Sequence, residues 1–267
     1  MTHLIPRFAS ILLYLCIGLP AQAEKQPNAI PKEQLHVYLL IGQSNMAGRA
    51  EFPEKDSHPI PRAFLLNGSD TWEKAKNPLN QYSTIRKKLK LQRMSPGYEF
   101  AREMLKANQD ISIGLVANAR GGTNIKAWQK GGEYYTEALR RTKKAMETGT
   151  LKGILWHQGE GDSRKSSSYL KSLEKLITDL RNDLGVAELP FIAGQVFYDA
   201  TNKPNTQKIN KEIAKLAATV PFTSHVSSEG LTTSDHTHFD YEGMSLLGKR
   251  YAAVSYTHLT LPTIYSV

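Results

Sequence analysis

The sequence predicts an α/β protein, in which a parallel β-sheet of about five strands lies between two layers of helices. Short apolar runs, typical of buried strands, alternate along the chain with longer segments whose apolar residues have a helical period. Buried strands separated by amphipathic helices indicate a parallel sheet covered on both faces. The chain has 267 residues, of which 40% are hydrophobic and 22% charged, as expected for a globular domain with a core.

The apolar runs and helical patterns can be placed along the chain. The predicted strands are Leu35–Ile41, Ala63–Leu66, Ile111–Ala117, Gly153–Trp156 and Phe191–Val196. A first helix is predicted to begin at Ser95-Pro96, where a capping serine precedes a proline at the first helical position. Later helices are predicted over about Tyr134–Thr148, Ser167–Leu184, Asn205–Ala218 and Tyr241–Val254. This order favours a flavodoxin-like three-layer α/β/α sandwich.

The two ends of the chain do not fit this pattern. Residues 1–23 have the features of a signal peptide, namely Arg7, an apolar run over Ile11–Leu19, and the small-x-small sequence Ala21-Gln22-Ala23. We therefore expect an exported protein, either periplasmic or secreted, with a single domain over residues 24–254. The last residues, 255–267, form either an edge strand or a tail added during cloning or assembly.

Composition excludes several classes of protein. The only cysteine, Cys16, lies in the predicted signal peptide, so the mature chain is expected to have no disulfide, thiolate metal site or cysteine nucleophile. No later stretch is apolar enough to cross a membrane. The net charge is +9, but the basic residues are dispersed, and the densest cluster, Arg86–Lys90, lacks interleaved aromatic residues. We interpret it as solvated surface and expect no nucleic-acid partner.

Small and polar residues follow three of the predicted strands. They are Gly42–Asn45, Asn118–Thr123 and His157–Glu160. Ligands of open parallel sheets bind beyond the carboxyl ends of the strands, so these segments are expected to meet at one site. A serine at such a turn, here Ser44, can direct its hydroxyl into the crevice, although a serine after a strand is also a common helix cap.

The segment Gly42-Gln43-Ser44-Asn45-Met46 resembles the first signature block of the SGNH-hydrolase superfamily, in the branch of sialate O-acetylesterases and acetyl-xylan esterases. Three further blocks follow in the family's order. The segments of this sequence that resemble them are Gly121–Ile125 with Trp128, Trp156–Asp162, and Asp235-His236-Thr237-His238-Phe239. The resemblance covers residues 37–254 and implies the SGNH-hydrolase fold.

The resemblance implies a catalytic triad of Ser44, Asp235 and His238. It also implies an oxyanion hole formed by the backbone N–H groups of Ser44 and Gly121, or of Gly122 in place of Gly121, together with the side-chain amide of Gln158. The chemistry agrees with these roles. A serine hydroxyl needs a base to accept its proton, and a carboxylate holds that imidazole in the required tautomer. Gln43, Asn45 and Glu160 are expected to support the site, with Glu160 bonded to the Ser44 turn.

Other polar residues near these blocks allow different interpretations. His236 is interpreted as a loop histidine, His157 as a pocket or second-layer residue, and Asp162 as a helix cap. Glu160 is the alternative acid. A metal centre could draw on His157, Glu160, Asp162, His236 and His238, but their spacing fits no recognised zinc pattern. We therefore expect neither a metal nor a cofactor.

The expected activity is removal of O-acetyl groups from a carbohydrate through an acyl-enzyme on Ser44. The partner is an acetylated carbohydrate, of the acetyl-xylan or O-acetyl sialic acid type. Alternatives are an SGNH esterase for another small ester, a non-catalytic glycan-binding module, and a binder of acidic polymers. The sequence leaves the sugar, the acetylated position and the oligomeric state open. Aromatic candidates for the pocket wall are Trp72, Trp128, Tyr134, Tyr198 and Phe239.

Overall fold

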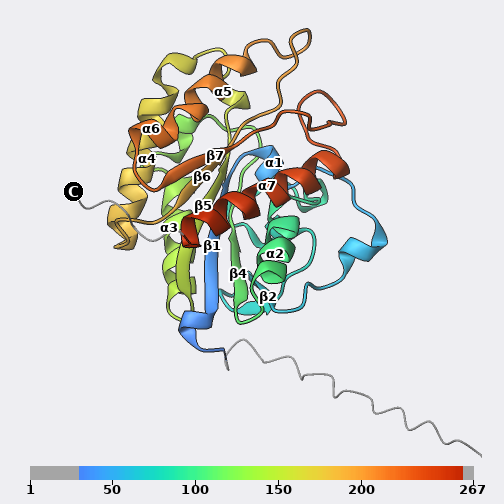
Figure 1. The fold of residues 1–267 in the computed structure, drawn as a ribbon, viewed down its shortest axis with the longest axis vertical. Coiled ribbons are helices and arrows are strands. Elements are labelled where there is room, and N and C mark those ends of the chain that lie inside the picture. Colours follow the sequence, from blue (N-terminus) through green and yellow to red (C-terminus); the bar gives the residue numbers. More distant parts are fainter. Residues whose placement is uncertain (1–29, 261–267) are drawn as a thin grey trace, which may run out of the picture.

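The computed structural model describes residues 30–260, and Figure 1 shows their arrangement. The predicted signal peptide (1–23) and the end of the predicted tail (261–267) lie outside the described residues. The described strands are β1 (Leu35–Gly42), β2 (Ala63–Leu66), β3 (Trp72–Lys74), β4 (Ser112–Ala117), β5 (Thr150–His157), β6 (Phe191–Gly194) and β7 (Thr223–Val226).

Helices connect most of these strands. The described α-helices are α1 (Ser44–Ala47), α2 (Pro96–Ala107), α3 (Glu133–Met146), α4 (Tyr169–Leu184), α5 (Thr206–Ala214), α6 (Leu216–Thr219) and α7 (Tyr241–Thr260). Short 3₁₀ turns occupy Lys32–Gln34, Glu54–Ser57, Leu79–Tyr82, Leu89–Leu91, Ile125–Trp128, Glu160–Asp162 and Ser166–Ser168. The helix expected over Asn205–Ala218 is present as α5 and α6, which are separated at Lys215.

Within residues 30–260 the strands form one seven-stranded sheet, in the order β3-β2-β4-β1-β5-β6-β7. All pairs are parallel except β2 with β3. The five predicted strands are confirmed, and the α/β sandwich is as expected. β3 and β7 are additional edge strands. β3 has three residues, and β7 carries the polar Ser224 and His225, so neither forms the continuous apolar run typical of a buried parallel strand.

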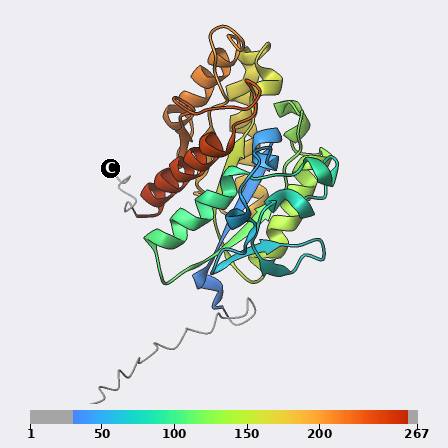
Figure 2. The same ribbon diagram turned by 90° about the vertical axis from the view of Figure 1, so that its right-hand side faces the viewer.

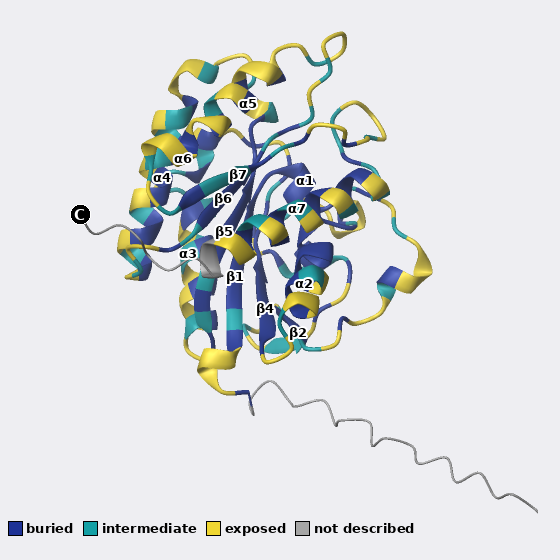
Figure 3. Cartoon of the chain, in the orientation of Figure 1, coloured by how far each residue is buried: buried dark blue, intermediate teal, exposed yellow. Residues whose placement is uncertain are grey.

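Side chains of β1 alternate between two apolar cores. Leu35, Val37, Leu39 and Ile41 pack into the core covered by α3, α4, α5 and α6. Tyr38 and Leu40 pack into the core on the opposite face, under α2 and α7. Figures 1 and 2 show α2 and α7 side by side on that face, and Figure 3 shows the strands as buried. The pleat of one strand thus contributes to both cores.

The carboxyl end of β1 lies between the ends of β4 and β5, as the polar strand ends predicted. Backbone bonds join the three segments. Gln43 N donates to His157 O (2.8 Å), and Arg120 N donates to Gly42 O (3.0 Å). The chain builds β2 and β4 on one side of β1 and then crosses to β5 on the other side. The site is therefore located where the sheet changes direction of growth, the usual ligand position in such folds.

The final helix is longer than the sequence predicted. α7 continues to Thr260, so residues 255–260 are helical and the edge strand considered for them is wrong. Ser255, in the last turns of the helix, is buried. The threonines in this stretch disfavour a helix only weakly, and the first helix-breaking residue is Pro262. Among the described residues, no helix combines the length and apolarity needed to span a bilayer.

Gly42 permits the turn that leads from β1 to Ser44. Its φ is +132°, and a Cβ at this position would lie 2.2 Å from His157 O of the neighbouring strand. We expect Gly42→Ala to lower the free energy of unfolding by at least about 3 kcal/mol, because backbone strain and a backbone clash add. Gly185→Ala is the matched control. Gly185 has a φ of +70° but no atom within 4 Å of the added Cβ, so only about 1 kcal/mol is expected. Urea unfolding measures both, and equal losses would contradict the proposed clash.

Candidate active site

Ser44 is the first residue of α1, the short helix that directly follows β1. Its side chain is largely buried, and its hydroxyl lies 3.0 Å from Nε2 of His238. The fold therefore brings two side chains that are 194 residues apart in the sequence within hydrogen-bond distance of each other. The expectation that Ser44 and His238 meet beyond the strand ends agrees with this geometry.

Asp235 holds the other nitrogen of the same imidazole. His238 Nδ1 lies 2.7 Å from Asp235 Oδ2, while Asp235 Oδ1 accepts bonds from the backbone N–H groups of Thr237 (3.0 Å) and His238 (2.7 Å). The loop between β7 and α7 thus folds around one carboxylate. Partial burial opposes ionisation of Asp235, but the bonds from His238 and Thr237 outweigh it and lower the pKa of this carboxyl. Asp235 is therefore ionised at neutral pH.

Asn45 fixes this loop relative to Ser44. Its fully buried amide donates to Glu160 Oε1 (2.8 Å) and to Thr237 O (3.1 Å), and its Oδ1 accepts from Phe239 N (3.1 Å). Thr237 and Phe239 are the neighbours of His238 on either side. The residue after Ser44 therefore positions the backbone on both sides of the imidazole.

Glu160 bonds to the Ser44 turn through Asn45, as the sequence predicted. Burial raises the pKa of Glu160 to about 7, although the bond from Asn45 and nearby backbone groups favour the charged form. Its Oε2 is buried without a hydrogen-bond partner among the described residues. This carboxyl contacts neither Ser44 nor His238 by a hydrogen bond, so its geometry does not fit the role of alternative acid.

The backbone N–H groups of Ser44 and Gly121 are among those near the serine for which no hydrogen-bond acceptor occurs in the described residues. Gly121 is buried, and a Cβ placed on it would lie 3.5 Å from the Cβ of Ser44. Gly122 is exposed instead, and its nearest side chain is that of Lys87. Of the two glycines left open by the sequence, Gly121 is the one that lies against the serine.

The side-chain amide of Gln158 has partners within the protein. Its side chain is fully buried, and its Nε2 lies within hydrogen-bond distance of Asp162 Oδ2 (2.7 Å), Thr123 O (3.0 Å) and Gln43 Oε1 (3.2 Å). An amide has two hydrogens to donate, and the Asp162 carboxylate is a strong acceptor for one of them. In this structure the amide is bonded within the protein and joins the segments after β4 and β5, so the oxyanion role of Gln158 stays a prediction.

Gln43 supports the site on the same side. Its Oε1 accepts from Gln158 Nε2 (3.2 Å) and from the backbone N–H of Gly161 (3.3 Å). Asp162 also accepts from Ile125 N (2.8 Å), so it caps the 3₁₀ turn Ile125–Trp128 rather than the helix after it.

The imidazoles of the two remaining candidate histidines form no hydrogen bond with Ser44. His157 is fully buried, its Nδ1 lies 3.3 Å from the hydroxyl of Tyr251, and burial lowers its pKa to about 3, so it stays neutral. His236 is exposed, with a φ of +57°, and lies 3.3 Å from Asp199. Among the described residues, no three His, Cys, Asp or Glu side chains gather in a way that could hold a metal ion.

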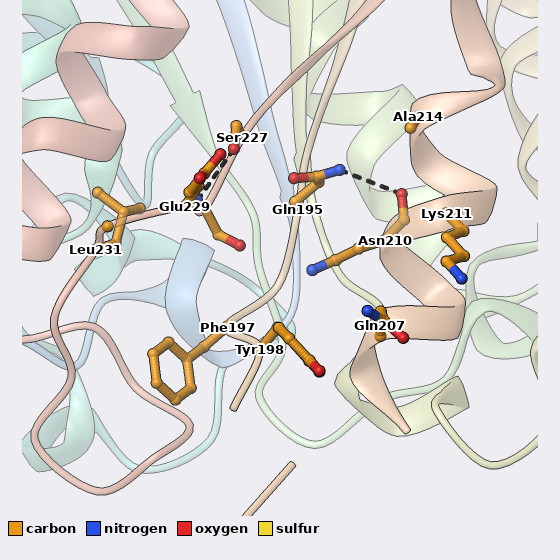
Figure 4. Close-up of a pocket in the computed structure, with 12 residues that line it drawn as sticks. Gln195, Phe197, Tyr198, Gln207, Asn210, Lys211, Ala214, Ser227, Glu229 and Leu231 are labelled. Atoms are coloured by element: carbon orange, nitrogen blue, oxygen red, sulfur yellow. Dashed lines mark hydrogen bonds between the residues drawn. The ribbon is translucent and has the colours of Figure 1, made fainter. Parts of the chain in front are cut away.

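The aromatic candidates separate into core and surface. Trp128 and Phe239 are fully buried, Trp72 and Tyr134 are partly buried against the core, and Tyr198 is exposed. Tyr198 borders a hollow of about 510 Å³ between the segment after β6, the loop after β7, and α5. Figure 4 shows Phe197, Tyr198, Gln207 and Asn210 among the residues that line it. Ser44, Asp235 and His238 do not line this hollow.

Sequence reasoning missed Arg49, which follows the first block. Its half-buried side chain donates from Nη1 to Gly48 O (2.6 Å) and Leu91 O (3.0 Å). Its Nη2 would lie 2.6 Å from a Cβ placed on Gly121. The position of Arg49 could not be predicted from a motif or a periodic pattern, because the direction of its side chain depends on the backbone turn at Gly48, where φ is +88°.

The raised pKa of Glu160 makes stability depend on pH. The Glu160 carboxyl binds its proton more tightly in the folded chain, where its pKa is about 7, than in the unfolded chain, where its pKa has the ordinary value of 4.5. The resulting stabilisation is therefore fully present below pH 4.5 and is lost as the pH rises through about 7. Between pH 5 and pH 8 the wild type should lose about 2 kcal/mol more unfolding free energy than Glu160→Gln. Urea unfolding at both values measures the difference. Parallel losses would show that Glu160 titrates normally.

Comparisons with known proteins agree with the four sequence blocks. The family model described as carbohydrate esterase, sialic acid-specific acetylesterase, matches residues 34–257. A probable carbohydrate esterase of Arabidopsis thaliana is 31% identical over 241 residues, which span 82% of this chain and 88% of that protein. The X-ray structure of the same plant protein superposes with a TM-score of 0.75 at 28% identity, covering 85% of this chain and 99% of that one.

More distant solved structures share the fold. NanS is 16% identical with a TM-score of 0.69, covering 86% of this chain and 99% of its own. A carbohydrate acetylesterase from Xanthomonas citri is 19% identical with a TM-score of 0.62, covering 87% of this chain and 58% of its own. The family model over residues 34–257 and the 31% identical plant relative confirm the branch that the sequence blocks predicted. The chain belongs to the carbohydrate esterase family of sialic acid-specific acetylesterases.

Proposed function

We propose that this chain is a serine esterase that removes O-acetyl groups from carbohydrates, of the acetyl-xylan or O-acetyl sialic acid type, through an acyl-enzyme on Ser44. The observation that carries the proposal is the chain of contacts from Ser44 Oγ to His238 Nε2 (3.0 Å) and from His238 Nδ1 to Asp235 Oδ2 (2.7 Å). These are the distances at which an imidazole can accept a hydroxyl proton while a carboxylate orients it.

The proposed reaction has two halves, and His238 accepts and then donates a proton in each of them. Ser44 Oγ attacks the acetyl carbonyl carbon while His238 Nε2 accepts its proton, so the new C–O bond forms as negative charge moves to the carbonyl oxygen. The intermediate then collapses, the bond between the carbonyl carbon and the sugar oxygen breaks, and His238 protonates that oxygen. In the second half, His238 accepts a proton from water, which attacks acetyl-Ser44. Acetate leaves, and the serine recovers its proton.

The charge on the carbonyl oxygen requires donors that are already in place. We assign this role to the backbone N–H groups of Ser44 and Gly121, because both lie beside the hydroxyl and neither has another acceptor among the described residues. In other enzymes, each such donor lowers the barrier by about 3–4 kcal/mol. Asn45 supports the reaction indirectly, since its amide holds Thr237 and Phe239 on the two sides of His238.

The predicted signal peptide supports a further proposal on location. Residues 1–23 carry the charge, apolar run and cleavage sequence of an exported protein, so we infer that the enzyme acts in the periplasm or outside the cell. The observation that tests this is the N-terminal sequence of protein recovered from medium and periplasm, which should begin after Ala23. Protein retained in the cytoplasm with residues 1–23 attached would contradict it.

Ser44→Ala should abolish acetate release while leaving the fold intact, because the small buried side chain is shortened by one atom. A loss of kcat on the order of 10⁶ is expected for a serine nucleophile. Free acetate released from acetylated xylan, O-acetyl sialic acid and 4-nitrophenyl acetate is the readout. Hydrolysis of a long-chain ester is measured beside them, because faster turnover of that ester would indicate a lipid substrate instead of an acetylated sugar. Ser69→Ala, at an exposed serine between β2 and β3, is the control. Undiminished activity of Ser44→Ala would refute the nucleophile.

Asp235→Asn should separate orientation from folding. The substituted amide oxygen can still accept from the N–H groups of Thr237 and His238, but its NH₂ faces His238 Nδ1 and drives the imidazole proton to Nε2. His238 Nε2 then carries a hydrogen and cannot accept the proton of Ser44, so kcat should fall roughly 10³- to 10⁴-fold. Stopped acetate assays measure this against Asp199→Asn, the carboxylate paired with His236. Equal effects at the two positions would contradict the assigned role.

A further inference from the structure

The guanidinium of Arg49 has one terminal nitrogen, Nη2, without a hydrogen-bond acceptor among residues 30–260. Nη1 of the same side chain donates to Gly48 O (2.6 Å) and to Leu91 O (3.0 Å). The carboxylate of Glu51, two residues later, pairs with Arg93 instead (2.7 Å). Burial and the neighbouring Arg93 both lower the pKa of Arg49, but a guanidinium stays protonated in proteins. Nη2 therefore carries hydrogens and positive charge that no described residue uses.

This free nitrogen lies at the corner between Ser44 and Gly121. A Cβ built on Gly121 would lie 2.6 Å from Arg49 Nη2 and 3.5 Å from the Cβ of Ser44. Because a Cβ is one bond from its Cα, Nη2 lies within about 4 Å of the Cα of Gly121. The serine side chain, the Gly121 backbone and the guanidinium thus border one small volume, which glycine leaves free by having no side chain.

The position of Arg49 is fixed through the segment that follows β4. Fully buried Asn80 accepts from Ala119 N (2.9 Å) and donates to Ala119 O (3.1 Å) in that segment. The same amide lies 2.8 Å from Gln92 Oε1. Gln92 is the neighbour of Leu91, whose carbonyl accepts from Arg49 Nη1. One buried amide therefore ties the anchor of the guanidinium to the chain that leads to Gly121, so the charged group is held in place before any reaction.

The carboxylates on the other side of the serine have partners of their own. Asp235 pairs with His238 (2.7 Å), and Glu160 accepts from Asn45 (2.8 Å). A half-buried cation without a counter-ion costs free energy unless a negative charge comes to it. In the reaction proposed for Ser44, such a charge develops on the carbonyl oxygen of the acetyl group.

We propose that Arg49 is a catalytic residue, whose Nη2 donates a hydrogen bond to the acetyl carbonyl oxygen as that oxygen becomes negative. This rests on the proposed esterase function, and it adds a charged donor to the backbone N–H groups of Ser44 and Gly121. The proton stays on Arg49 throughout, so proton transfer remains with His238. Because the bond is stronger to an oxyanion than to a neutral carbonyl, it lowers the barrier more than it tightens substrate binding.

Arg49→Gln should lower kcat for 4-nitrophenyl acetate about 10²-fold and change KM by no more than about twofold, because the lost bond belongs to the transition state. Arg49→Lys keeps the charge without the planar fork, so its loss should be intermediate. Arg93→Gln is the matched control. Arg93 contacts the same loop, through Nη1 to Lys90 O (3.0 Å), and should keep the wild-type kcat.

Replacing the carbonyl oxygen of the substrate by sulfur separates this role from a structural one. Sulfur is a weak acceptor, so 4-nitrophenyl thionoacetate gains little from a donor at the oxyanion position. The ratio of kcat/KM for the oxygen ester over the sulfur ester should therefore fall about tenfold or more in Arg49→Gln. A substitution that only displaced Ser44 or the loop would slow both esters by the same factor. Release of 4-nitrophenolate measures both rates.

Gly121→Ala gives a second test that does not depend on the folding of Arg49→Gln. The added Cβ would displace the free end of the Arg49 side chain, whereas its distance to Ser44 is an ordinary contact. The oxygen-to-sulfur ratio should fall here too. If the new methyl group merely crowded the acetyl group, it would slow both esters alike and leave the ratio unchanged.

The outcomes distinguish this inference from the function on which it rests. A wild-type kcat in Arg49→Gln, or an unchanged oxygen-to-sulfur ratio in both Arg49→Gln and Gly121→Ala, overturns the catalytic role of Arg49. A ratio that falls in these variants but not in Arg93→Gln supports it. Failure of the esterase function is recognised separately, because the wild type would then lack Ser44-dependent hydrolysis of 4-nitrophenyl acetate.

Discussion

The site depends on one buried amide, that of Asn45. It links α1 to Thr237 and Phe239, the residues on either side of His238, and its remaining contact is with Glu160 after β5. Three segments distant in sequence are thus joined at a side chain that is fully buried. An amide suits the position because it donates and accepts at once, whereas a carboxylate could not donate to Thr237 O and Glu160. The distance between Ser44 and His238 follows from this bridge.

The two carboxyl groups of the site have opposite electrostatic environments. Asp235 is more than half exposed and receives bonds from two backbone N–H groups and an imidazole, so its pKa is lowered. The carboxyl of Glu160 is buried and has a single side-chain donor, Asn45, and its pKa is raised to about 7. The environment thus keeps the first ionised beside the imidazole and lets the second carry a proton near neutrality.

Much of this architecture could be predicted because the alternation of apolar runs with amphipathic segments is visible in the sequence. Buried runs such as Leu35–Ile41 indicate strands, and the polar residues after them indicate where a site forms. β3 and β7 could not be predicted, because edge strands need not be continuously apolar. α7 continued past Val254, because weakly unfavourable threonines do not end a helix that packs on a sheet.

For the site, residue types and spacing were sufficient to bring together Ser44, Asp235 and His238, but not to orient the neighbouring side chains. The amide of Gln158 turns toward Asp162, four residues later, because a carboxylate is a stronger acceptor than the alternatives nearby. Arg49 and Lys87 come from loops whose paths are set by glycine turns and by contacts with the segment after β4. Such directions depend on tertiary contacts, which a sequence pattern does not contain.

The order of these groups along the chain makes their meeting a late event in folding. The hydroxyl at position 44 belongs to the first strand–helix turn of the fold, whereas the imidazole at position 238 lies just before its last described helix. The two groups are 194 residues apart, so no local segment contains both of them. A fragment that stops before position 238 can form β1 and its neighbours, but it cannot form this contact.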